Sequence, residues 1–153
     1  MPPWLLAVMW VTFLINGSAV AQQQSEMDAV KAANQAFYAA LSARDISAMQ
    51  KVWSSDADTQ NLGPRDKAFT VGWDTMKNGF GRLFDSLAEL NVSMTEPRIK
   101  IVGSVAWASG IEQAQRKDKT GATSSGTNLA TNIFQNQDGR WLMVHHHASL
   151  MPQ

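Results

Sequence analysis

Residues 138–149 read DGRWLMVHHHAS, a turn dipeptide followed by a segment in which large apolar and polar residues alternate. Aspartate-glycine after an apolar run is typical of a β-hairpin, and the aromatic and β-branched residues favour a strand. Strict alternation places Trp141, His145 and His147 on one face of this strand. Because Trp141 has a large apolar surface to bury, we expect that face to be the inner one and His146 to point outwards.

The preceding segment supplies further polar groups to the same face. A four-residue loop over 136–139 pairs Gln135 with Arg140, which sets Asn132 opposite Met143 and Asn128 opposite His147. Imidazoles and amides buried without partners would each cost about 2 kcal/mol or more, so a polar pocket is the simplest explanation for this face.

Three other interpretations of the histidines stay open. They could be structural residues that are hydrogen-bonded within the sheet, or the remnant of a purification tag. His145 and His147 could also bind zinc, but the nearest acidic residue, Glu112, is predicted to face the other way. We therefore predict no metal and no cofactor.

The rest of the chain shows a helical period first and a period of two afterwards. Predicted helices cover 25–43, 46–53 and 73–90, a short strand covers 59–62, and long strands cover 92–102, 105–116, 123–135 and 140–150. Helices followed by an antiparallel meander predict an α+β fold with the helices on one sheet face.

Composition limits the classes of function. The chain has 153 residues, enough for one domain, and its 13 basic and 13 acidic residues cancel, which argues against a nucleic-acid partner. Cysteine is absent, which excludes disulfides and a thiol nucleophile.

The first residues resemble a secretory signal. Trp4 to Ile15 form an apolar run that is too short to span a membrane, residues 16–18 read as a helix break, and Ala19 and Ala21 suit signal peptidase. We expect residues 1–21 to be a signal peptide and 22–153 to be a single mature domain in the periplasm or outside the cell, with no membrane contact. The segment before Trp4 lacks the usual basic residue, so the alternatives are an uncleaved anchor or a wrongly assigned start of the chain.

The order of these elements resembles the nuclear transport factor 2-like superfamily over about residues 26–150. The resemblance rests on Arg44-Asp45, on Gly72-Trp73-Asp74, and on Asp-Gly-Arg-Trp followed by Val-His-x-His-x-Ser at the chain end. Its nearest branches are the SnoaL-like proteins and the association domain of calmodulin-dependent kinase II. The resemblance implies a cone in which helices close over a curved sheet, a pocket inside the cone, and dimerisation through the outer sheet face.

Together with the alternation and pairing of the last two strands, the resemblance predicts which residues line the pocket. Ketosteroid isomerases carry a general-base Asp where this chain has Asn61 and an oxyanion-donating Tyr at about Phe37, so that chemistry is lost. The kinase association domains carry an Arg where this chain has Asn132, and its absence favours neutral ligands over carboxylates. The predicted pocket residues are His145, His147, Asn128, Asn132, Trp141, Phe37, Trp53, Asn61 and Trp73.

Two functions follow, and the sequence leaves both open. The first is a non-catalytic domain for binding a small neutral polar or apolar molecule or for assembly. The second is an isomerase, polyketide cyclase-like enzyme or hydrolase acting on a small apolar molecule, with His145 or His147 as the acid/base. A homodimer is predicted through a row of outer-face residues, namely Leu142, Val144, His146, Ala148 and Leu150.

Overall fold

The computed structural model describes the backbone of residues 4–151 and the side chains of residues 19–151. The described residues form three helices and six strands. In chain order they are α1 (Trp4–Ala43), α2 (Ile46–Val52), β1 (Gln60–Leu62), β2 (Thr70–Val71), α3 (Trp73–Ser86), β3 (Leu87–Val102), β4 (Val105–Asp118), β5 (Thr123–Gln137) and β6 (Arg140–Leu150). The predicted α+β class is confirmed.

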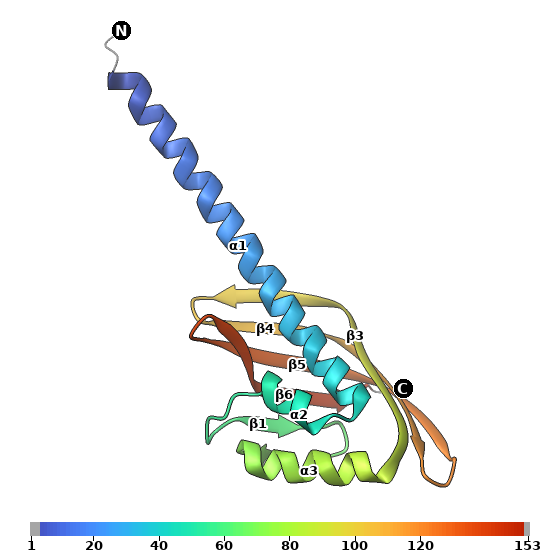
Figure 1. Ribbon diagram of the computed structural model, residues 1–153. Coiled ribbons are helices and arrows are strands. Elements are labelled where there is room, and N and C mark those ends of the chain that lie inside the picture. Colours follow the sequence, from blue (N-terminus) through green and yellow to red (C-terminus); the bar gives the residue numbers. More distant parts are fainter. Residues whose placement is uncertain (1–3, 152–153) are drawn as a thin grey trace.

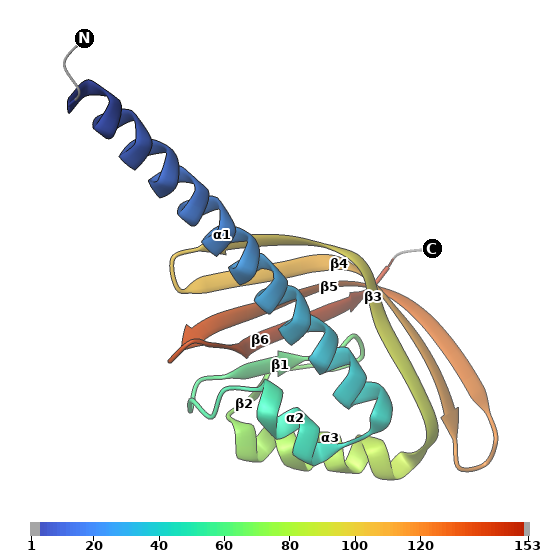
Figure 2. The same ribbon diagram turned by 45° about the horizontal axis from the view of Figure 1, so that its top comes forward.

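The strands form one curved sheet that does not close on itself. Their order is β2-β1-β6-β5-β4-β3, and all neighbours are antiparallel except the pair β1 and β6. The C-terminal half of α1 crosses the concave face of the sheet. Helices α2 and α3 lie below α1 in both views, near strand β1 (Figures 1 and 2). This arrangement is the predicted cone, with its interior between the helices and the sheet.

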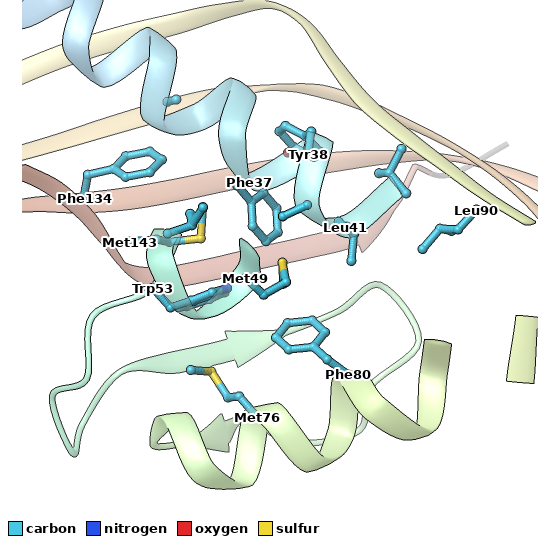
Figure 3. Close-up of a cluster of buried hydrophobic side chains, with 14 of the residues drawn as sticks. Phe37, Tyr38, Leu41, Met49, Trp53, Met76, Phe80, Leu90, Phe134 and Met143 are labelled. Atoms are coloured by element: carbon cyan, nitrogen blue, oxygen red, sulfur yellow. The ribbon is translucent and has the colours of Figure 1, made fainter. Parts of the chain in front are cut away.

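The core lies in that interior. Figure 3 shows Phe37 of α1 facing Phe80 and Met76 of α3, with Met49 of α2 between them. These four side chains are all at least nine-tenths buried, and each contributes about 1.5–3 kcal/mol by leaving water. The core therefore fixes the helices against the sheet and defines the inner face.

The start of the chain differs from the prediction. Helix α1 runs without interruption from Trp4 to Ala43, whereas a break at residues 16–18 and a new start at Ser25 were expected. No helix in the part of the chain that the structure describes is long and apolar enough to span a membrane. Residues 1–3 lie outside the described part, and the predicted signal peptide stays a prediction.

The junction between α3 and β3 also lies earlier than predicted. The helix ends at Ser86, whose hydroxyl donates to the Leu83 carbonyl at 2.7 Å, and strand β3 begins at Leu87. Leu90, predicted to end the helix, is a buried strand residue that lines the cavity described below.

The β5–β6 hairpin closes through a tighter turn than expected. Gln137 pairs with Arg140, so the loop is the dipeptide Asp138-Gly139, and both residues have positive φ (52° and 82°). A two-residue turn with left-handed residues matches the twist of the strands better than the predicted four-residue loop. The predicted pairing of Gln135 with Arg140 is therefore wrong.

A β-bulge on β6 changes which side chains face inwards. Ile133 pairs with His145 and Phe134 pairs with Met143, so Val144 is an extra residue without a partner. Such a residue inverts the alternation of the strand beyond it. As a result His146 is buried, whereas His145 and His147 lie on the outer face.

Two predictions fail for this reason. The inner face does not carry His145 and His147, and His146 does not point outwards. The predicted dimerisation row is also broken, because His146 and Ala148 face the interior, at 4% and 2% exposure.

Candidate functional site

A buried histidine forms the polar base of the cone interior. His146 lies in the middle of β6, paired with Asn61 of β1 on one side and Asn132 of β5 on the other. Its ring packs against Phe37 at a centroid distance of 5.1 Å. The neighbouring strands and α1 thus hold the imidazole in one orientation.

Asn132 fixes the tautomer of this histidine. Its Nδ2 donates to Asn34 Oδ1 at 2.7 Å and to the Tyr38 hydroxyl at 3.2 Å, which leaves Oδ1 as the acceptor that faces His146 Nδ1 at 2.6 Å. His146 Nδ1 must therefore carry the proton and donate it. In the neutral ring, Nε2 is then an acceptor without a proton.

A buried glutamate lies beside that nitrogen. Glu112 of β4 is 3% exposed, and its Oε2 is 4.0 Å from His146 Nε2. Tyr38 donates its hydroxyl proton to Oε2 at 3.2 Å, and Asn128 Nδ2 donates to Oε1 at 2.8 Å. The carboxyl group is thus positioned by two donors from different elements.

Burial controls the charge of both groups. It lowers the pKa of His146 to about 3, with the neighbouring His145 and His147 acting in the same direction. Burial also raises the pKa of Glu112, against the effect of the hydrogen bonds from Asn128 and Tyr38. His146 is therefore neutral at physiological pH, and the carboxyl group is more easily protonated than a solvated one.

His146 and Glu112 open onto a cavity of about 350 Å³ between α1, α3 and the sheet. Its walls are mainly apolar, and Asn61 adds a third polar group near the base. The apolar lining residues are Phe37, Leu41, Pro64, Met76, Phe80, Leu83, Leu90, Val92 and Ala114.

Four of the predicted pocket residues lie at this site. Phe37 and Asn61 line the cavity. Asn132 and Asn128 are fully buried behind it and orient His146 and Glu112 through the hydrogen bonds described above.

The other predicted residues lie elsewhere. Trp53 and Trp141 belong to the buried core, and Trp73 packs at its edge, but none of them lines this cavity. On the outer sheet face, His145 and His147 lie beside Phe69, at ring distances of 5.7 and 6.4 Å.

Four residues of this site were not predicted, namely Asn34, Tyr38, Glu112 and His146. Asn34 and Tyr38 are one helical turn apart, a spacing that places them on one helix face. Glu112 shares its strand face with Ala106, Ala108 and Ala114, and small residues of this kind mark the face that a helix covers. Because Trp107 and Ile111 are large and apolar, the strand face that carries them was predicted to be the inner one. In the structure these two residues are 38% and 43% exposed.

No group of three His, Asp or Glu side chains that could hold a metal ion occurs among the described residues. The polar base is instead a hydrogen-bonded cluster of amides, a phenol, a carboxyl group and an imidazole.

Comparison with known proteins identifies the family. The model of the SnoaL-like domain matches residues 30–153. The chain belongs to the SnoaL-like domain family. This SnoaL-like chain is also 24% identical over 123 residues to the F-box protein SKIP8 of Arabidopsis thaliana, across 80% of the chain and 50% of that protein. It thus spans about half the length of that relative.

Solved structures confirm the fold of this SnoaL-like domain. A protein from Streptomyces avermitilis, named as a candidate dehydratase of the nuclear transport factor 2-like family, superposes with a TM-score of 0.77 at 19% identity, over 85% of this chain and 99% of that one. A candidate calcium/calmodulin-dependent protein kinase II association domain from Xanthomonas campestris gives a TM-score of 0.70 at 20% identity, over 81% and 86% of the two chains. The predicted superfamily resemblance is confirmed.

Proposed function

We propose that this SnoaL-like domain binds a small, mostly apolar molecule in the cavity, with a hydrogen-bond donor of the ligand at His146 Nε2. The observation that carries the proposal is the orientation of His146, whose Nδ1 is occupied by Asn132 and whose Nε2 lies beside Glu112 in the cavity lining.

The cavity has the properties of a ligand site. Its volume of about 350 Å³ lies within the range of small-molecule pockets, roughly 300–1,000 Å³, and such pockets combine apolar walls with a few oriented polar groups. The apolar walls favour an aromatic or alicyclic body.

The base of the cavity presents a hydrogen-bond acceptor, His146 Nε2, to a ligand. No hydrogen bond of His146 Nε2 is found among the described residues, and its distance of 4.0 Å to Glu112 Oε2 is too long for one, so this acceptor is available in the cavity lining. A ligand hydroxyl or N–H group would supply the missing hydrogen bond. Such a ligand would also be held away from bulk water by Phe37 and Phe80.

Binding of 2-naphthol, measured by calorimetry with the full chain, tests this proposal. We expect His146→Phe to weaken binding by about tenfold, the value of one lost hydrogen bond in a buried site. The matched control is His147→Phe on the outer face, which should bind like the wild type. Naphthalene lacks the donor and should bind both variants alike. A loss of 2-naphthol binding in His147→Phe with normal binding in His146→Phe would contradict the proposal.

Acid/base catalysis is the second candidate, and the pair formed by His146 and Glu112 favours it. Burial raises the pKa of Glu112, so its carboxylate is a stronger base than a solvated one and its protonated form can return the proton, whereas burial leaves His146 a weak base that lies beside it. Exchange of the protons beside the carbonyl of 1-tetralone, followed by NMR in D₂O, measures such proton transfer. Exchange accelerated by the wild type and lost in Glu112→Gln supports an enzyme, and a rate equal to that of buffer argues against this activity.

We also propose that residues 1–21 direct export of the protein to the periplasm or out of the cell.

A further proposal is that two copies of the chain associate through the outer sheet face. The outer face carries four exposed apolar side chains on β4 and β5, namely Val105, Trp107, Ile111 and Leu129, of which Ile111 and Leu129 are paired neighbours. Burying such a patch is a common basis for symmetric dimers. The Xanthomonas campestris neighbour, named as an association domain, is consistent with assembly.

A further inference from the structure

Arginines surround the outer part of the same cavity. Arg116 comes from β4, Arg65 from the loop between β1 and β2, and Arg82 from α3, and all three line the cavity. The acidic residues in the lining are Glu112 at the base and Asp66. The cavity therefore has an apolar middle, an uncharged imidazole at its base and a cationic outer part.

Arg116 is directed to the cavity by its position on the strand. It follows Glu112 and Ala114 at intervals of two on β4, so the three side chains share the inner face. Lys117, the next residue, has the opposite orientation and forms an ion pair with Glu89 at 2.8 Å. Strand β4 thus supplies Lys117, which is paired with Glu89 outside the cavity, and Arg116, which lines the cavity.

Arg116 has no carboxylate partner of its own. Of the ion pairs within 4.0 Å among the described residues, none involves Arg116, Arg65 or Arg82. Asp66 Oδ2 accepts the backbone N–H of Gly63 at 2.7 Å. Burial and the nearby Arg65 lower the pKa of Arg116, against the opposing effect of Glu112 and Asp66. A second arginine near a half-buried guanidinium produces a repulsion that a bound anion would relieve.

We propose that the ligand carries a carboxylate at the end opposite its hydrogen-bond donor and that Arg116 binds this carboxylate. This inference rests on the proposed function, since it concerns a ligand of the same cavity. It replaces the expectation of a neutral ligand, which was based on the lack of an arginine at position 132. The structure supplies the guanidinium from β4 instead of β5.

A matched pair of ligands tests the charge directly. 6-Hydroxy-2-naphthoate combines a donor, an apolar body and a carboxylate, and 6-hydroxy-2-naphthamide has the same shape without the charge. We expect the wild type to bind the acid about tenfold more tightly than the amide in calorimetry at neutral pH. Arg116→Gln should abolish this preference by weakening the binding of the acid far more than that of the amide, and Arg116→Lys should retain part of it.

Arg98→Gln on β3 is the control, because it removes the same charge from an exposed site outside this cavity. A circular dichroism spectrum of Arg116→Gln equal to that of the wild type shows that the variant is folded. Equal binding of acid and amide by the wild type would overturn the carboxylate inference and leave the proposed function standing. Failure of the wild type to bind either compound would overturn both.

Discussion

Replacing Asn132 with leucine should destabilise the domain strongly, although leucine has the same number and branching of side-chain heavy atoms. Asn132 is fully buried and makes hydrogen bonds with Asn34, Tyr38 and His146, which are themselves at least 94% buried. The substitution leaves Asn34 Oδ1 and His146 Nδ1–H without partners.

The magnitude follows from those two orphaned groups. Each buried polar group that loses its partner costs about 1–3 kcal/mol, so Asn132→Leu should lower the free energy of unfolding by about 2–6 kcal/mol. The lost bond to Tyr38 adds less, because the Tyr38 hydroxyl still donates to Glu112. A loss of this size is a large part of the roughly 5–15 kcal/mol that stabilises a typical domain.

Urea denaturation of the full chain, followed by circular dichroism, measures this loss. Thr131→Leu is the matched control, because Thr131 is the preceding residue on β5 and faces outwards beside His147. We expect the control to change the free energy of unfolding by no more than about 1 kcal/mol. An Asn132→Leu variant as stable as this control would refute the hydrogen-bond network and, with it, the assigned tautomer of His146.

Three further predictions concern protonation, assembly and processing. Because the pKa of His146 falls to about 3 in the fold, the unfolded chain binds the proton more readily below pH 6.5. The stability of the wild type relative to His146→Phe should thus decrease by about 1.4 kcal/mol per pH unit as the pH falls from 6.5 towards 3, and a constant difference in urea titrations would contradict this. Leu129→Glu should convert a dimer to a monomer in sedimentation velocity by placing a charge in the outer face, whereas a wild-type monomer at micromolar concentration would end the dimer proposal. The intact mass of exported protein should correspond to a chain that begins at Gln22, and a mass that retains residues 1–21 would favour an anchor.

The fold was predictable because its signals are short-range and repeated. The helical period up to α3, the change to alternation afterwards and the turn residues at Gly103 and Asp138-Gly139 each indicate the same architecture. Errors at the ends of single elements, such as the early start of β3, leave the order of the elements unchanged.

The site was less predictable because it depends on the register of one strand pair. The tight turn shifts the pairing by two residues, which changes partners but keeps every side chain on its face. The bulge at Val144 shifts it by one, which exchanges the two faces for all residues beyond it. Nothing in the alternation of residues 140–150 marks the bulge. The prediction therefore placed His145 and His147 on the inner face and His146 on the outer face, the reverse of the structure.

The central claim is that His146, oriented by Asn132, presents a free Nε2 to a ligand in the cavity. NMR of the full chain with ¹⁵N-labelled histidine, recorded at neutral pH before and after addition of 2-naphthol, tests it most directly. We predict that His146 carries its proton on Nδ1 and that its Nε2 resonance shifts on binding, while the signals of His145 and His147 stay in place. A proton on His146 Nε2, or a ligand-induced shift confined to His145 and His147, would contradict the claim.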